Sequence, residues 1–206
     1  MKASLKRPLL AAILASGPAL EITDWSLDEA ALEIILAEVD LGPQMIIECG
    51  SGVSTILIGR LLRERQRGSL YSLEHDSDWV TLGRSRLAAE GLETYVRIVE
   101  APLEAEPEAA YGCLWYSRSS LGELPDRGVD LLLVDGPPAP AGSSERSRYP
   151  ALPVLAPRLA ANARLILDDV ERAGEAWVLD RWRREFGLNG LRRSGALALA
   201  TLSPAR

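Results

Sequence analysis

The stretch that decides the fold of this chain reads MIIECGSGVST, from Met45 to Thr55. A mostly apolar run ends in Glu48 and Cys49, and two glycines spaced one residue apart follow it. Apolar residues then recur at helical spacing, so the stretch indicates a buried parallel strand, a tight turn and the N-terminus of a helix. Open α/β sheets bind ligands at such a turn, because the strand's carboxyl end and the helix's unpaired N–H groups face the same crevice.

The residues of the turn restrict the ligand that this crevice can take. Nicotinamide and flavin dinucleotides usually require a third glycine behind the pyrophosphate, and Thr55 stands at that position. The carboxylate of Glu48 would repel a pyrophosphate, but it suits a ligand with positive charge and hydroxyl groups. S-adenosylmethionine offers an ammonium group, a sulfonium group and a ribose diol. The run Glu-x-Gly-x-Gly-x-Ser-Thr, from Glu48 to Thr55, resembles motif I of the class I S-adenosylmethionine-dependent methyltransferases.

This resemblance implies cofactor-binding residues at the ends of several strands. Glu74 ends a second predicted strand, 24 residues after Gly50, where related folds place the carboxylate that binds the ribose diol. The alternative, that Glu74 merely begins the next helix, stays open. His75 would lie near the adenine or ribose, and Ala101 and Pro102 would line the adenine side. The predicted cofactor-binding residues are Glu48, Gly50, Ser51, Gly52, Ser54, Thr55, Glu74, His75, Ala101, Pro102 and Asp135.

Composition and charge exclude several classes of function. A chain of 206 residues is long enough for one well-buried domain and short for two. The net charge of −6 argues against a nucleic-acid partner, which normally needs a basic face, and the basic residues between 60 and 67 are expected to face solvent. A single histidine and two cysteines leave no basis for a Ser-His-Asp hydrolase, a multi-histidine metal site or a disulfide framework.

The N-terminal segment is expected to be a helical extension over residues 1–24, ahead of the main domain at 25–206. It combines early basic residues with a short apolar run, which favours an amphipathic docking helix over a signal peptide. Ser26 and Glu29 then form a predicted capping box, with Trp25 placed to pack against the new helix. No apolar stretch approaches the roughly 20 residues that span a bilayer. We therefore expect a cytoplasmic protein without a membrane partner.

Strand and helix patterns alternate from Met45 to Phe186, which predicts one doubly wound α/β sheet. Further strands are expected at 95–100, 129–134 and 163–167, and a closing hairpin around Gly195. The segment 104–127 is less regular and is interpreted as a short helix, an irregular strand at 113–116 and a loop. The methyltransferase resemblance implies a Rossmann-like, mostly parallel seven-stranded sheet with helices on both faces and a C-terminal antiparallel hairpin.

Three aspartates stand at the ends of two neighbouring predicted strands. Asp135 follows the strand 129–134, and Asp168 and Asp169 follow the next one. Gathered at one edge of the sheet, they would be costly without a cation, so a divalent ion such as Mg²⁺ is a natural partner. The pattern is similar to the metal-dependent O-methyltransferases of the catechol, caffeoyl-coenzyme A and macrocin types. That resemblance implies metal ligation by Asp135, Asp168 and Asp169.

The chain also departs from the catechol type. No lysine occurs in the run from Gly136 to Ala139, where those enzymes carry a base. A base would therefore have to be Asp135, a metal-bound hydroxide, or nothing beyond the metal, and Asp135 is the predicted catalytic residue. The segment 139–148 is expected to form a flap over the pocket, and its arginines, Arg146 and Arg148, are expected to be solvated loop residues, although either could meet an acidic substrate.

The leading hypothesis is O-methylation of a small-molecule hydroxyl group, with S-adenosylmethionine as cofactor and a divalent metal as an assistant. Metal-independent methylation of an oxygen or nitrogen atom is the nearest variant. A noncatalytic nucleoside-binding or scaffold module on the same fold is the alternative from another class. A dehydrogenase is disfavoured by Thr55. The partner is expected to be a small molecule, not a nucleic acid, and a homodimer is one expected assembly.

Overall fold

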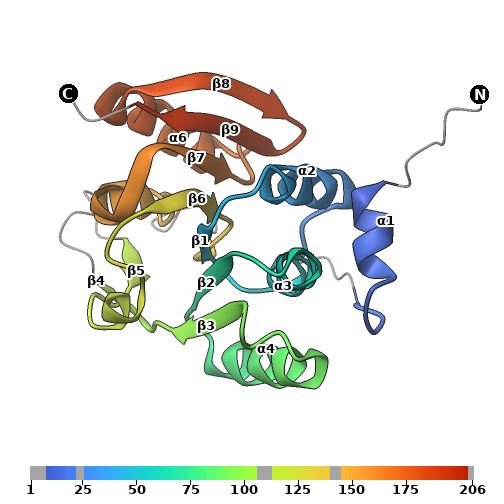
Figure 1. The fold of residues 1–206 in the computed structure, drawn as a ribbon. Helices are drawn as coiled ribbons and strands as arrows, with labels where there is room; N and C mark the ends of the chain where they lie inside the picture. The colour runs from blue at the N-terminus through green and yellow to red at the C-terminus, as the bar shows by residue number, and fades with distance from the viewer. Residues whose placement is uncertain (1–7, 22–25, 106–112, 140–144, 204–206) are drawn as a thin grey trace, which may run out of the picture.

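The computed structural model describes residues 8–21, 26–105, 113–139 and 145–203. Seven strands of this part form one sheet in the order β3-β2-β1-β6-β7-β9-β8 (Figure 1). The first five strands in that order run parallel to one another. β9 is antiparallel to both of its neighbours, β7 and β8, which confirms the predicted sheet and closing hairpin. The strand bounds are β1 Met45–Cys49, β2 Ser69–Glu74, β3 Val96–Glu100, β6 Val129–Val134, β7 Leu159–Leu167, β8 Leu188–Ser194 and β9 Leu197–Leu202.

Helices cover both faces of the sheet, as predicted (Figure 1). Successive strand residues point to opposite faces, so Ile46 belongs to one apolar core and Ile47 to the other. The first core lies under α1 Leu9–Leu14, α2 Glu29–Asp40, α3 Val53–Arg65 and α4 Ser77–Glu90. The second lies under α5 Ala151–Leu155, α6 Ala173–Phe186 and the 3-10 turns η1 Ser120–Glu123 and η2 Ala156–Arg158.

Two predicted element boundaries were wrong. Asp28, rather than Ser26, caps α2, because its carboxylate directly precedes the first helical residue and accepts the N–H of Ala31 at 2.7 Å. Trp25 lies outside the described residues. The sequence after Tyr149 also predicts a helix through Leu155 and Leu159. In the structure α5 ends at Leu155, η2 ends at Arg158, and β7 begins at Leu159. Pro157 stands in that last turn, and its missing N–H does not favour continuing the helix.

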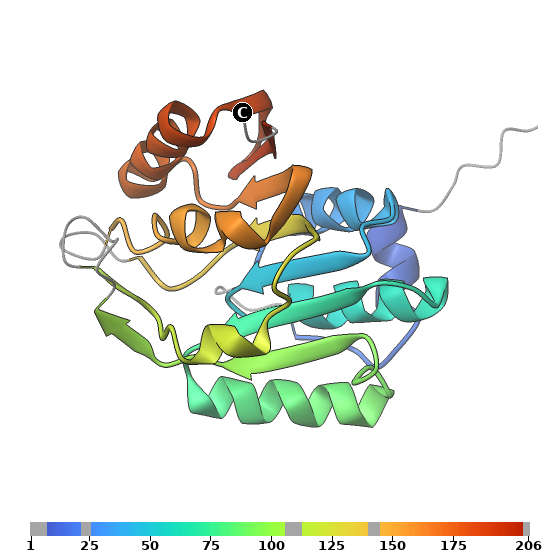
Figure 2. The ribbon, with the colours of Figure 1, turned by 60° about the vertical axis from the view of Figure 1, so that its left-hand side comes forward.

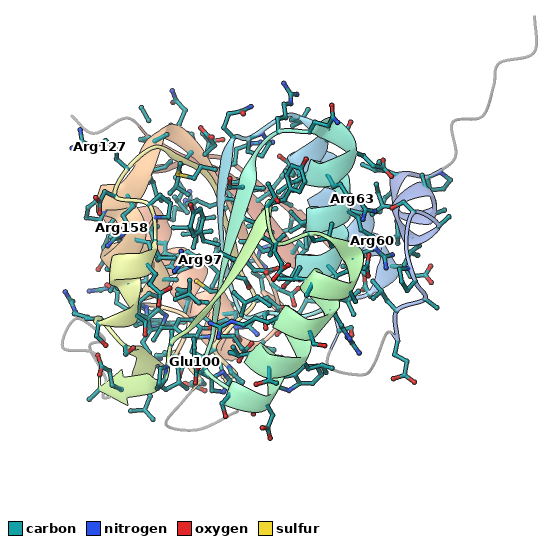
Figure 3. The ribbon with its side chains drawn as sticks, turned by 60° about the horizontal axis from the view of Figure 1, so that its bottom comes forward. Arg60, Arg63, Arg97, Glu100, Arg127 and Arg158 are labelled. Atoms are coloured by element: carbon teal, nitrogen blue, oxygen red, sulfur yellow. The ribbon has the colours of Figure 1, made fainter. Side chains whose placement is uncertain are left out.

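Arg60 corrects the expectation that the basic residues of α3 face solvent. Its side chain is fully buried and forms an ion pair with Glu90, at 2.7 Å between Nε and Oε2. The same guanidinium donates to the backbone carbonyl oxygens of Leu14 and Pro18, at 3.2 and 2.6 Å. Figure 3 shows Arg60 and Arg63 on the side of α3 that faces α1. The N-terminal helix is therefore joined to the main core by a buried cation.

A second, two-stranded sheet lies beside the main one. It pairs β4 Leu103–Ala105 with β5 Leu114–Tyr116 in antiparallel order. The strand predicted at 113–116 thus exists, whereas much of the predicted short helix falls on residues 106–112, outside the described part. Trp115 and Tyr116 of β5 are buried in the second core. Their burial explains why two aromatic residues occur in an irregular stretch.

The two edges of the main sheet carry charged side chains. On β3, Arg97 is exposed and pairs with Glu123 at 2.5 Å, and Glu100 is also exposed (Figure 3). On β8, Arg192 and Arg193 are exposed. Among the described residues, no helix combines the length and apolar character that crossing a membrane demands.

Candidate functional site

The predicted site residues gather where the parallel strands end. The arrowheads of these strands point to one side of the molecule in Figure 2, and the turns after β1, β2, β6 and β7 lie there. β1 is the point at which the strand order reverses, with β2 on one side and β6 on the other. Ligands of open α/β sheets bind at such a position, so the fold places the candidate site at this edge.

The turn after β1 contains two glycines with different surroundings. Gly50 has a φ of +92°, which only glycine adopts readily, and a Cβ there would lie 3.1 Å from the Cα of Gly136. Gly52 has extended backbone, and a Cβ there would meet nothing within 4 Å. The turn therefore packs against the chain after β6 at Gly50 and borders open space at Gly52, where α3 begins.

Glu48 lies beneath this turn and is fully buried. Ser54 donates to one of its oxygens at 2.6 Å, and Thr55 and Ser72 donate to the other at 2.6 and 2.7 Å. Burial raises the pKa of Glu48, and the three hydroxyl groups oppose that rise. Thr55 also accepts the N–H of Gly52 at 2.9 Å. Glu48 thus holds the turn from below through two hydroxyl groups of the first turn of α3 and one from β2.

Glu74 stands at the end of β2 and reaches the same turn. One of its oxygens accepts the N–H and the hydroxyl group of Ser51, at 3.0 and 2.8 Å. The other accepts the N–H groups of His75 and Asp76, at 2.7 and 2.9 Å. Burial by itself would raise the pKa of Glu74, but these bonds and the imidazole of His75 lower it to about 2. The carboxylate is therefore charged and fixed in place.

The remaining predicted cofactor residues flank Glu74. His75 places Nδ1 2.9 Å from Glu74 Oε1, and hydrogen bonding to this carboxylate raises the pKa of the imidazole. Ala101 is buried and donates its N–H to the backbone oxygen of Glu74 at 2.7 Å. Pro102 is exposed beyond it. The structure thus brings the ends of β2 and β3 together beside the crevice.

The three predicted metal ligands also meet. Asp135, Asp168 and Asp169 each offer a carboxylate oxygen, and these oxygens lie within 4.8 Å of one another. Burial raises the pKa of Asp135 well above its ordinary value, and the neighbouring aspartates add to the rise while Arg148 opposes it. The pKa of Asp168 is raised by burial and by Asp169. We call these three residues the acidic rim.

Arg148 corrects the expectation of a solvated loop arginine. Its side chain is only 4% exposed and points into the acidic rim. Nη2 lies 3.0 Å from Asp169 Oδ2 and 3.4 Å from Asp135 Oδ1, and Nη1 donates to the backbone oxygen of Asp168 at 3.2 Å. The sequence contained a signal, because clustered buried carboxylates require a cation and the loop after Asp135 supplies one.

One further acidic residue and one further basic residue belong to this cluster, and the sequence had indicated neither. Glu175, in the first turn of α6, is buried with Oε1 3.8 Å from Nε of Arg148. Arg172 lies 2.8 Å from Asp169 Oδ2. Carboxylates are the ligand type that Mg²⁺ prefers, so the donor atoms suit a divalent ion. One carboxylate oxygen of Asp135 and one of Asp169, however, are already paired with the guanidinium of Arg148, so the residues present do not fit the predicted metal.

Tyr116 is another residue at the crevice that the sequence analysis did not assign. Its hydroxyl group is buried and has no hydrogen-bond partner among the described residues. A Cβ at Gly136 would lie 2.6 Å from this hydroxyl oxygen, which places it beside the contact between Gly136 and Gly50. Burial raises the pKa of Tyr116 well above 10. The group is therefore a neutral hydrogen-bond donor and not a base.

Comparisons with known proteins identify the family and the fold of this chain. A family model described as a methyltransferase domain matches residues 47–170, which is more than half of the chain. No curated protein matches the sequence.

Solved structures resemble the chain over nearly its whole length. One is a putative O-methyltransferase from Klebsiella pneumoniae, with 20% identity, a TM-score of 0.58, and coverage of 97% of this chain and 92% of that one. A second is an O-methyltransferase from Bacillus cereus in complex with SAH, with 15% identity, a TM-score of 0.62, and coverage of 97% and 93%. A third is the O-methyltransferase TomG from Streptomyces achromogenes in complex with SAM, with 14% identity, a TM-score of 0.61, and coverage of 96% and 91%.

Proposed function

Because the chain belongs to the S-adenosylmethionine-dependent methyltransferases, we propose that it transfers the methyl group of this donor to a hydroxyl oxygen of a small molecule. The observation that carries the proposal is the arrangement of the turn after β1 beside the end of β2. There the turn at Gly52 borders open space while the ionised carboxylate of Glu74 is fixed beside it. The solved O-methyltransferases with the same fold support an oxygen acceptor.

The cofactor is proposed to lie over the turn after β1. Its methionine part would face the N-terminus of α3 above Gly52, and its ribose would face Glu74. Oε1 of Glu74 already accepts hydrogen bonds from the backbone N–H groups of His75 and Asp76 and lies 2.9 Å from the imidazole of His75, and Oε2 accepts two bonds from Ser51, one of them from its rotatable hydroxyl group. We expect a ribose hydroxyl group to replace that of Ser51. His75, Ala101 and Pro102 would then border the adenosine.

The acceptor is proposed to lie beside Asp135, at the end of β6. In the reaction the acceptor oxygen forms a bond to the methyl carbon, and the bond from that carbon to sulfur breaks with its electron pair left on sulfur. The hydroxyl proton goes to the carboxylate of Asp135. What the protein supplies is position, because holding two reactants in line removes much of the entropic barrier.

Calorimetry with S-adenosylmethionine and its homocysteine product tests the first part of the proposal. We expect binding that is strongly weakened in Glu74→Ala and unchanged in Glu64→Gln, an exposed residue on α3. In Ser51→Ala, affinity should be kept, because the ribose takes over the bond. Failure of both ligands to bind the wild-type protein would remove the proposed activity.

Turnover separates an enzyme from a noncatalytic binding module. We propose incubation with a donor labelled in the methyl group and a metabolite extract. Label transferred to a small molecule, in a form stable as an ether, supports O-methylation. Binding of the donor without any transfer would instead favour the nucleoside-binding module.

We also propose that the partner is a small molecule and not a nucleic acid, and that the protein acts in the cytoplasm. The net charge of −6 supports the first statement, because nucleic-acid binding relies on basic surfaces. Filter binding with RNA and DNA and cell fractionation test the two statements. Light scattering tests whether the chain forms the homodimer considered above.

A further inference from the structure

We propose that the guanidinium group of Arg148 takes the place of a divalent cation at the acidic rim, so that methyl transfer needs no metal ion. In this role Arg148 is a positioning residue that holds Asp135 toward the acceptor. The inference rests on the proposed function for its consequence in catalysis. The contacts of Arg148 carry it.

The first argument is geometric. The Arg148 side chain bridges the turn after β6 and the turn after β7. Nη2 meets a carboxylate oxygen from each turn, Asp135 at 3.4 Å and Asp169 at 3.0 Å. Nη1 and Nε donate to the backbone oxygens of Asp168 and Pro137, at 3.2 and 3.5 Å. Its planar fork thus joins both turns, as a bound ion would join their carboxylates.

The second argument concerns burial and charge. A guanidinium that is 4% exposed has lost nearly all its water, and such burial is tolerated only when paired with opposite charge. Asp135, Asp169 and the buried Glu175 supply that charge around it. If the Arg148 side chain moved away to admit a metal ion, the backbone oxygens that it contacts would lose their hydrogen-bond donor. If the side chain stayed, the metal ion and the guanidinium group would lie in contact and repel each other.

A third observation points the same way. The oxygen of Asp169 that meets Arg148 also lies 2.8 Å from Nη1 of Arg172. One carboxylate oxygen of Asp169 is therefore shared by two guanidinium groups. Asp169 adopts a left-handed φ of +61°, and its backbone oxygen accepts the N–H of Arg172 at 2.8 Å. The turn after β7 thus places Asp169 in contact with both Arg148 and Arg172.

The experiment measures metal binding and methyl transfer separately. Mn²⁺ binding is followed by electron paramagnetic resonance in the wild type, Asp168→Asn, Arg148→Met, Arg148→Lys and Arg148→Met/Asp168→Asn. Arg146→Met is the matched control, because Arg146 lies two residues away and stacks over Trp177 at 4.4 Å, outside the rim. Donor affinity and turnover are measured with and without a chelator.

We expect the wild type and Arg146→Met to bind no Mn²⁺ at millimolar concentrations and to ignore the chelator. Arg148→Met should gain Mn²⁺ binding that the added Asp168→Asn change removes. Its kcat should fall by roughly 100-fold with donor affinity little changed, because Asp135 loses its position. Arg148→Lys should restore part of kcat, since it returns the charge without the fork.

Three results would overturn the inference. One is Mn²⁺ binding by the wild type that Asp168→Asn abolishes. Another is chelator-sensitive turnover that Mg²⁺ restores. The third is a folded Arg148→Met variant that gains no metal site. If Arg148→Met does not fold, the wild type and Asp168→Asn still decide by Mn²⁺ binding. Failure of the proposed function appears differently, as absent donor binding in all variants, and leaves the Mn²⁺ measurement intact.

Discussion

Ser51 and Glu74 are joined by two hydrogen bonds to one carboxylate oxygen, from the hydroxyl group at 2.8 Å and from the backbone N–H at 3.0 Å. This pair links the turn after β1 to the end of β2. The bonds act on the charged form of Glu74, since burial alone would have raised its pKa and they instead lower it to about 2. The link therefore depends on pH.

The first prediction concerns Glu74→Gln and pH. A carboxyl group with a lowered pKa stabilises the fold fully above its unfolded value of 4.5 and loses this effect as pH falls toward 2. We expect Glu74→Gln to lower the free energy of unfolding by up to about 3 kcal/mol at pH 7 and by progressively less below pH 4.5. Urea unfolding at pH 7, 4 and 3 measures this, with exposed Glu64→Gln as control. A constant difference at all three pH values would contradict the expectation.

The second prediction contrasts two glycines at the crevice. Gly136→Ala should cost about 1–3 kcal/mol of stability, because its Cβ would lie 2.8 Å from the Cα of Gly50. Gly52→Ala should change stability by less than about 1 kcal/mol, since nothing lies within 4 Å of its Cβ. If the open space receives the donor, Gly52→Ala should still weaken donor binding. Thermal unfolding and calorimetry separate the two effects, and unchanged affinity in Gly52→Ala would move the donor elsewhere.

The third prediction tests the hydroxyl groups beneath the turn. Thr55 donates to Glu48 at 2.6 Å and accepts from Gly52 at 2.9 Å, so Thr55→Val removes both bonds without changing shape. We expect a loss of about 1–3 kcal/mol, because the buried carboxylate loses a donor. Thr81→Val, whose exposed hydroxyl group donates to Ser77, is the matched control and should change little. Equal effects of the two changes in denaturant unfolding would refute the structural role of Thr55.

The fourth prediction concerns the cation that holds α1. Arg60→Met leaves the buried Glu90 and the carbonyl oxygens of Leu14 and Pro18 without their donor. We expect a loss of about 3–5 kcal/mol, because the remaining charge stays buried and unpaired. Hydrogen exchange in residues 9–14 should also accelerate. Arg97→Met removes an exposed pair on β3 and should cost at most about 1 kcal/mol.

The fifth prediction assigns a use to the hydroxyl group of Tyr116. No described residue accepts or donates a hydrogen bond to it, so Tyr116→Phe should leave the free energy of unfolding unchanged within about 1 kcal/mol. Donor affinity should fall by about 3- to 10-fold if the group meets the cofactor beside Gly136. Calorimetry with the wild type and Tyr116→Phe decides, and equal affinities would leave the hydroxyl group without a role in binding.

Much of the sheet could be predicted because buried strands and tight turns are local patterns. The apolar runs that end at Gly50 and at Asp135 predicted two of the strands, and the residues that follow these runs indicated the edge of the sheet where the site lies. Glu74 was found by its distance along the chain from Gly50. Its partner Ser51 was named only through the motif.

The burial of Arg60 and Arg148 could not be predicted from the sequence, because the groups that pair with these side chains are distant along the chain. Arg60 looks like a surface residue of α3 until α1 folds over it, and its carbonyl partners lie more than 40 residues earlier. Arg148 lies in a loop rich in polar residues, and only the meeting of two turns surrounds it with carboxylates. The cap of α2 was misplaced for a smaller reason, since Ser26 and Asp28 both have side chains that can cap.

The charged edges of the main sheet have a consequence for self-association. A bare outer strand invites another copy to add its own strand, which is a common route to aggregates. Here an incoming strand would meet Arg97 and Glu100 on β3, or Arg192 and Arg193 on β8, and would have to strip them of water. Any dimer of this protein is therefore expected to join through helix surfaces, and crowding should not drive it into fibrils.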